Sequence, residues 1–180
     1  MINLILIFSN IVFAAPSINF DGAYSKPCQK YETVSSSEQL QITDQSWIRS
    51  YQLFSDSECA APSVQTDYSY KVLRTYQMID MTVLKVQMTA MTESVAEKFN
   101  QTNYCGFTDW SVGQSKDVSG VKCGAVAMSS VGSMVYSVLY GEKDSTRKGR
   151  IFLGMPSESA DGSTEFKRYY VIDPTSFIEN

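Results

Sequence analysis

Residues 68–88 read YSYKVLRTYQMIDMTVLKVQM, and their pattern indicates the fold class. Large residues alternate with polar ones in the first part of this stretch, and this period of two predicts a β-strand with two different faces. One side of that strand carries Tyr68, Tyr70, Val72, Arg74 and Tyr76. A second strand follows over 79–88, in which Met81, Val83 and Lys85 are expected to lie opposite Thr82, Leu84, Val86 and Met88.

The same strand pattern recurs along the rest of the chain. Further strands are predicted over 18–24, 40–43, 47–54, 105–112, 121–128, 134–140, 151–153 and 166–172. In the strand over 47–54, alternation places Trp47, Arg49, Tyr51 and Leu53 on one face. Ser94 and Glu97 have the spacing of a capping box, which predicts one short helix near residues 94–101 with Ser94 as its N-cap. We therefore predict an all-β protein, a single antiparallel up-and-down barrel of about eight to ten strands, with a β-sandwich as the alternative.

The amino-terminal residues predict export from the cytosol. Residues 2–15 are almost entirely apolar but too short to span a bilayer, and Val12-Phe13-Ala14 resembles a signal-peptidase site. We predict a secretory signal peptide over 1–14 and one barrel domain over 15–180, in a secreted or periplasmic protein. A buried amino-terminal strand is the alternative.

Composition excludes several classes of function. The 180 residues include no histidine, so a Ser-His-Asp triad is impossible and the commonest metal ligand is missing. The net charge of −4 and the scarcity of basic runs argue against nucleic-acid binding. No second apolar run has transmembrane length. We expect a monomeric, non-enzymatic protein without cofactor, metal or membrane span.

Four cysteines, Cys28, Cys59, Cys105 and Cys123, allow three disulfide pairings. We favour Cys28–Cys59 and Cys105–Cys123, because each pair is then separated by about two strands, the spacing of neighbours in a meander. An even number of cysteines fits an oxidising compartment.

Several short motifs resemble those of lipocalins. Gly22-x-Tyr24 on the first strand resembles the lipocalin Gly-x-Trp opening, and Arg168 on the last strand resembles the arginine that packs over that aromatic residue. The order of the cysteine segments and of Trp110 also looks like that of secreted lipocalin-like barrels. The resemblance implies a carrier of a small apolar molecule; another small secreted barrel of the same architecture stays an alternative.

Aromatic residues on alternating strand positions are the best candidates for a binding site. If they line a cavity, they make an apolar pocket with hydroxyl groups, which suits a small hydrophobic or amphipathic ligand. The alternative is a filled barrel that contacts another protein through the loops 142–149 and 156–164. Residues 100–102 also match the N-glycosylation pattern. The candidate cavity residues are Trp47, Tyr51, Tyr68, Tyr70 and Trp110.

Overall fold

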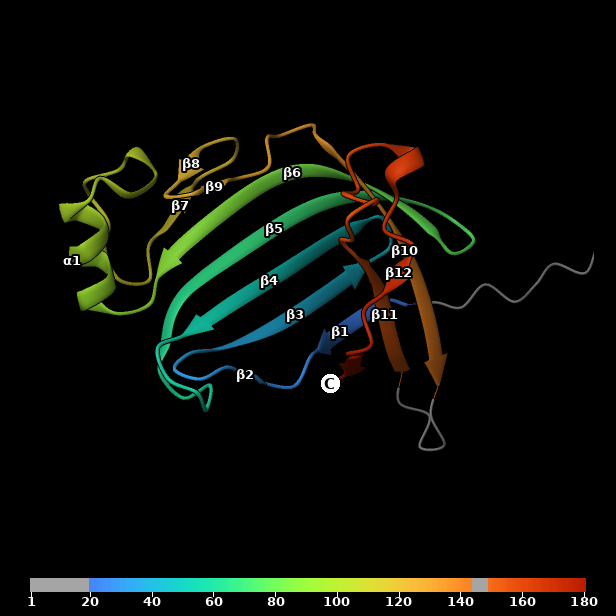
Figure 1. Cartoon of the computed structure of the whole chain (residues 1–180), viewed down its shortest axis with the longest axis horizontal. Coiled ribbons are helices and arrows are strands. Elements are labelled where there is room, and N and C mark those ends of the chain that lie inside the picture. Colours follow the sequence, from blue (N-terminus) through green and yellow to red (C-terminus); the bar gives the residue numbers. More distant parts are fainter. Residues whose placement is uncertain (1–19, 144–148) are drawn as a thin grey trace, which may run out of the picture.

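The structure, a computed structural model, describes residues 20–143 and 149–180. Eight antiparallel strands form a closed barrel in which each strand pairs with the next one around and the last pairs with the first (Figure 1). This confirms the predicted all-β, up-and-down barrel; the predicted signal peptide over 1–14 lies outside the described residues. The barrel strands are β1 (Gly22–Ser25), β3 (Ser35–Thr43), β4 (Ser46–Phe54), β5 (Pro62–Thr75), β6 (Met78–Ala90), β10 (Met134–Lys143), β11 (Gly149–Met155) and β13 (Phe177–Glu179).

Shorter elements lie between the barrel strands along the chain. An eight-strand barrel with a single α-helix is compatible with the lipocalin-like architecture. Among the described residues, no helix has the length and apolar character that a bilayer crossing requires. The shorter elements are β2 (Gln29–Lys30), α1 (Glu93–Gln101), η1 (Tyr104–Gly106), β7 (Ser115–Asp117), β8 (Lys122–Cys123), β9 (Val126–Ala127), η2 (Glu165–Lys167) and β12 (Val171–Ile172).

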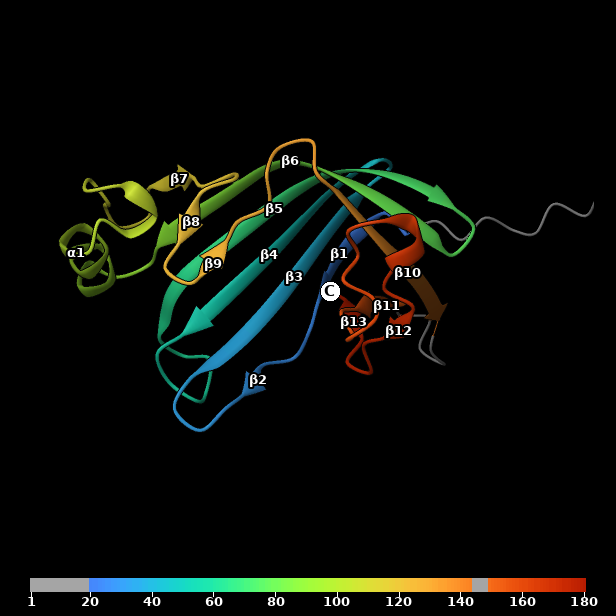
Figure 2. The same ribbon diagram turned by 45° about the horizontal axis from the view of Figure 1, so that its top comes forward.

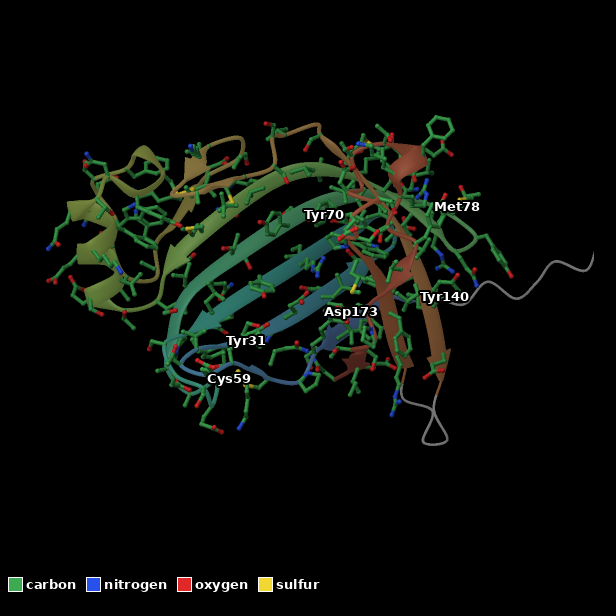
Figure 3. All side chains as sticks on the ribbon, viewed as in Figure 1. Tyr31, Cys59, Tyr70, Met78, Tyr140 and Asp173 are labelled. Atoms are coloured by element: carbon green, nitrogen blue, oxygen red, sulfur yellow. A yellow bond between two sulfur atoms is a disulfide. The ribbon has the colours of Figure 1, made fainter. Side chains whose placement is uncertain are left out.

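The register of the four long strands sets the inner surface of the barrel. Directly opposed residues of neighbouring strands share a face, so each row across β3, β4, β5 and β6 holds four inward side chains. From one end of the sheet to the other, the rows are Ile42, Trp47, Tyr70 (labelled in Figure 3) and Val83; Leu40, Arg49, Tyr68 and Val86; Glu38, Tyr51, Thr66 and Met88; and Ser36, Leu53, Val64 and Ala90.

The barrel is closed over only part of this surface. Strand β10 pairs with residues 78–82 of β6, whereas residues 87–89 of β6 pair with the short β7. Figures 1 and 2 show β10, β11 and β12 at one end of the long strands and α1 with β7–β9 at the other. We call the region around Trp47, which β10 and β11 face, the closed half. The rows of Tyr51 and Leu53 form the open half.

A bulge in β6 corrects one predicted strand face. Tyr68 pairs with Val86 but Tyr70 pairs with Val83, so Leu84 is an extra residue on β6. Such an insertion reverses the alternation beyond it. Val86 therefore lies on the same inner face as Val83, not on the opposite face as predicted, and both side chains are fully buried.

The segment after β6 forms a small cap, residues 91–128. Its helix begins after Thr92, whose Oγ1 accepts a hydrogen bond from the N–H of Val95, so the prediction of Ser94 as N-cap is wrong by two residues. The predicted strand over 105–112 is also wrong, because the chain forms η1 and an extended loop there. Side-chain packing decides this region: Trp110 is 3 % exposed and sits edge-on against Phe99 at 5.1 Å between ring centroids.

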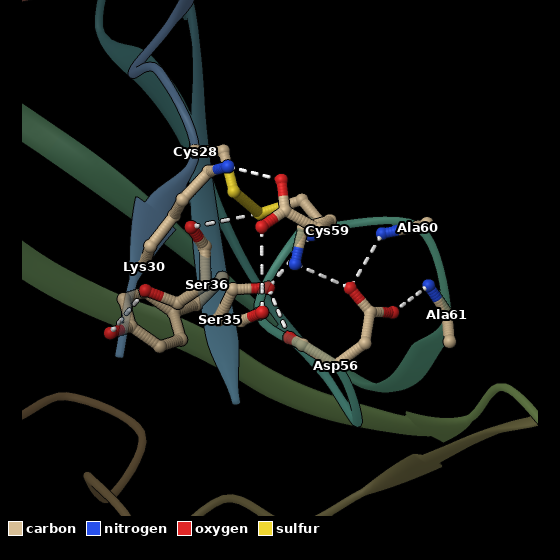
Figure 4. The surroundings of a disulfide bond; sticks show 11 residues. Cys28, Lys30, Ser35, Ser36, Asp56, Cys59, Ala60 and Ala61 are labelled. Atoms are coloured by element: carbon tan, nitrogen blue, oxygen red, sulfur yellow. Dashed lines mark hydrogen bonds and ion pairs between the residues drawn. A yellow bond between two sulfur atoms is a disulfide. The ribbon is translucent and has the colours of Figure 1, made fainter. Parts of the chain in front are cut away.

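Both predicted disulfides are confirmed. Cys28–Cys59 joins the start of β2 to the loop between β4 and β5, and Cys105–Cys123 joins η1 to β8 within the cap. Figure 4 shows the first bond beside Ser35, whose Oγ accepts from the N–H of Cys59 at 2.9 Å. In the described chain, both bonds therefore lie at the open half or in the cap.

Arg168 has a different place from the one that the lipocalin resemblance implies. It follows η2 instead of lying on a strand, and its guanidinium is 5.3 Å from the ring centre of Tyr136, not over Tyr24. Nη1 donates to the carbonyls of Ile79 and Ser137, at 2.9 Å each. The side chain is buried and holds the segment around η2 against β6 and β10.

Candidate functional site

A pocket of about 310 Å³, which we call the trough, extends from the Tyr51 row of the open half to Tyr70 in the Trp47 row. Its part in the open half has no facing barrel strand in the described chain, because β10 pairs only with residues 78–82 of β6. The floor comes from neighbouring positions of β4 and β5 only. It consists of Arg49, Tyr51, Thr66, Tyr68 and Tyr70.

The aromatic floor is ordered by strand alternation. Tyr68 and Tyr70 are two residues apart on β5, and their rings lie nearly parallel, with centroids 6.2 Å apart and an angle of 7°. The Tyr68 hydroxyl donates to Sδ of Met128, in the loop that follows β9, at 3.9 Å. The Tyr51 hydroxyl donates to Oγ of Ser36 at 3.5 Å. The hydroxyls thus make long, weak contacts to the protein.

A network of four charged side chains borders the floor. Lys26 Nζ contacts Glu38 Oε1 at 3.1 Å and Asp173 Oδ2 at 2.7 Å. Nε of Arg49 donates to Glu38 Oε2 at 2.8 Å, and Nη2 reaches the same oxygen. Two positive and two negative groups cancel, which is how a largely buried cluster of this kind can be stable. Lys26 also lies 4.7 Å from the ring centre of Phe177.

The network and the tyrosines shift each other's ionisation. Burial alone would raise the pKa of Asp173, but hydrogen bonds from Lys26 and Thr175 and the attraction of Lys26 and Arg49 lower it overall. Burial likewise opposes the charge on Arg49, yet Glu38 more than offsets this and raises its pKa. Burial raises the pKa of Tyr70 strongly and that of Tyr68 as well, against a lowering influence of Arg49. The floor therefore carries neutral phenols beside a fixed cation.

The structure separates the five candidate residues into three places. Tyr51, Tyr68 and Tyr70 lie together in the trough. Trp47 is 3 % exposed in the closed half, where it borders a cavity of only about 40 Å³ together with Tyr70. Trp110 is in the core of the cap, and its Nε1 donates to the carbonyl of Tyr104 at 3.1 Å.

Two residues that line the trough, Arg49 and Thr66, are missing from the sequence-based set, as is the neighbouring Glu38. Arg49 alternates with Trp47 and Tyr51 on one predicted face, so strand alternation alone was enough to include it. Glu38 lies outside the strand predicted over 40–43, whereas the structure places it within β3. Its role depends on Lys26 and on pairing across strands, for which the sequence offers no signal.

A second depression, of about 270 Å³, lies at the opposite end of the barrel. Its polar groups are engaged with each other: Asp21 accepts from the N–H of Asp44 at 2.7 Å, and Arg74 lies 4.3 Å from the ring centre of Phe20. The trough, with its tyrosine hydroxyls in weak contacts, is the better candidate for a ligand.

Asn100, the first residue of the glycosylation motif, makes two hydrogen bonds to the backbone of Trp110. Oδ1 of Asn100 accepts from the N–H of Trp110 at 2.6 Å, and Nδ2 donates to the Trp110 carbonyl at 3.0 Å. The amide nitrogen that a glycan would occupy is therefore part of the cap.

The chain matches no protein-family model and no curated protein.

Proposed function

We propose that this is a non-enzymatic binding protein that takes up one small amphipathic molecule in the trough. The observation that carries the proposal is the pocket of about 310 Å³ itself, lined by three tyrosines and one arginine. Ligand pockets commonly combine an apolar or aromatic lining with a few fixed polar groups, at volumes of ~300–1,000 Å³. The trough is at the lower end of this range, which suits a small ligand.

The proposed setting is outside the cytosol, as a secreted or periplasmic protein. Two disulfides support an oxidising compartment, where such bonds persist. The residues that line the trough are strand positions of β4 and β5, so the site is built on rigid elements and needs no folding step upon binding.

Titration with N-phenyl-1-naphthylamine, a neutral amphipathic fluorophore, tests this proposal. We expect saturable binding of one molecule by the wild-type protein and a loss of about tenfold in affinity in Tyr68→Ala, the ~1.4 kcal/mol expected for one aromatic contact. Tyr140→Ala is the matched control, because Tyr140 lies on the outer face of β10 and is 40 % exposed. Equal affinities in all three proteins, or no saturable binding, would contradict the proposal.

The alternative function is contact with another protein through the surface. Phe166 favours it, since its side chain is 95 % exposed, and Tyr170, four residues further along the chain, is 60 % exposed. Solvation of two such rings is unfavourable unless a partner covers them. The two functions separate cleanly, because Phe166→Ser leaves the trough intact and Tyr68→Ala leaves the Phe166 surface intact. Part of the predicted contact loop 142–149, residues 144–148, lies outside the described chain.

A further inference from the structure

The carboxylates beside the trough have their oxygens already engaged. Glu38 uses Oε1 for Lys26 and Oε2 for Arg49. Asp173 uses Oδ2 for Lys26 and Oδ1 for the N–H of Thr175, at 2.9 Å. A cationic ligand would have to displace one of these short bonds. Glu38 is also only 9 % exposed, so such a ligand would reach it with difficulty.

Arg49, in contrast, has donor capacity to spare. A guanidinium carries five N–H groups, and the hydrogen bonds of this side chain use Nε and Nη2 on a single oxygen of Glu38. Among the described residues, Nη1 has no hydrogen-bond acceptor. The Arg49 side chain is 35 % exposed and lines the trough. The one charged group that the trough offers to a ligand is thus a donor.

The tyrosines determine what the rest of the ligand must be. Tyr51 is opposite Thr66, and Tyr68 is opposite Arg49 across the β4–β5 pair, so the rings surround the guanidinium on one concave surface. The nearly parallel rings of Tyr68 and Tyr70 present flat apolar faces, which favour a planar or apolar body over a flexible polar one.

We propose that the trough selects a small amphipathic anion, an aromatic or apolar carboxylate or sulfonate. Its anionic group accepts from Nη1 of Arg49, and its body lies across Tyr51, Tyr68 and Tyr70. The neighbouring charges of Lys26, Glu38 and Asp173 with Arg49 sum to zero, so an added anion meets no net repulsion there. Charge-assisted hydrogen bonds from arginine are about twice as strong as neutral ones, which makes the anion the preferred acceptor. This inference rests on the proposed function.

Two fluorophores that differ by one sulfonate group test the inference. 1-Anilinonaphthalene-8-sulfonate carries the anion, and N-phenyl-1-naphthylamine has the same rings without it. We expect the wild-type protein to bind the sulfonate about tenfold or more tightly than the neutral probe. Arg49→Gln should remove this preference, so that the affinities for the two probes lie within about twofold of each other.

Two further variants make the result decisive. Lys71→Gln removes one positive charge from the outer, exposed face of β5 and should leave both affinities unchanged. Arg49→Lys keeps the charge beside Glu38 but loses the planar donor arrangement, and we expect an intermediate loss of about threefold for the sulfonate. If Arg49→Gln fails to fold, Arg49→Lys carries the test, and an unchanged sulfonate affinity in it overturns the inference.

The outcomes separate this inference from the function on which it rests. Equal wild-type affinities for the two probes, or an equal loss in Lys71→Gln and Arg49→Gln, would overturn anion selection while the binding function stands. If neither probe binds the wild-type trough, the proposed function fails and anion selection fails with it.

Discussion

The closed and open halves of the barrel are built from the same four strands, yet they are stabilised differently. In the closed half, β10 and β11 face the long strands, and Trp47 fills the space between them, leaving a cavity of about 40 Å³. In the open half, the Tyr51 row faces the trough, and Cys28–Cys59 fastens the adjoining ends of the strands. A sheet that lacks a facing layer buries less apolar surface, so a covalent link compensates for a thin core.

Backbone contact shows the same difference. In the closed half, a Cβ on Gly154 would lie 2.1 Å from the carbonyl oxygen of Tyr169. The two backbone segments therefore approach each other more closely than a residue with a Cβ would allow. Around Gly154, packing of this density leaves no room for a ligand. Two ends of one sheet can therefore take separate roles. The end that β10 and β11 cover contributes to stability, and the uncovered end offers the surface proposed for binding.

Truncation of one aromatic residue in each half should give the largest difference in stability between the two halves. Trp47→Ala removes a fully packed side chain and should lower the free energy of unfolding by ~3–5 kcal/mol. Tyr51→Ala removes a half-buried ring from the trough floor and should cost about 1 kcal/mol. Urea unfolding followed by far-ultraviolet circular dichroism measures both. Similar losses in the two variants would show that the halves do not differ in packing.

Removal of the disulfide at the open end should have the next largest effect. The sequence separation of Cys28 and Cys59 is 31 residues, and loss of a loop of this size costs ~3–4 kcal/mol in the chain-entropy description. We expect the double variant Cys28→Ser/Cys59→Ser to lose amide protection first in residues 35–38 and 51–54, by local opening.

Hydrogen exchange resolved by residue is the measurement, and the amides of residues 79–82 in the closed half are the internal control. A uniform loss of protection over both halves would mean that the barrel opens as one unit and that the disulfide does not act locally.

The smallest expected effect is a loss of stability in alkali. Burial holds the pKa of Tyr70 well above its ordinary value near 10. The folded protein therefore keeps the Tyr70 proton at a pH at which the unfolded chain has lost it. The Tyr70 contribution to the free energy of unfolding is therefore fully present below about pH 10 and declines as the pH rises further.

Urea midpoints at about pH 9 and about pH 11 check this sign, and Tyr70→Phe should reduce the difference between them. Tyr140→Phe, on the outer surface, is the control. An alkaline loss that is the same in Tyr70→Phe and the wild type would place its origin in other residues.

Strand alternation was sufficient to predict much of the trough. The period of two placed Trp47, Arg49 and Tyr51 on one face of their strand, and Tyr68 with Tyr70 on one face of theirs. The register brings the two sets together on the inner face of the barrel. Alternation failed where one residue broke the period, at Leu84, and where packing competed with local preference, in the cap around Trp110. In both places strand alternation gives no signal of the interruption.

Strand alternation, a local property, was enough to predict the all-β class, and cysteine spacing favoured the disulfide pairing that the structure has. Only the tertiary structure decided which tyrosines share a surface and that Glu38 links Lys26 to Arg49. It also decided that the barrel is open at one end, since β10 stops pairing with β6 at Thr82. The physical reason is that burial and ion pairing depend on which segments face each other, and no local pattern specifies the facing layer.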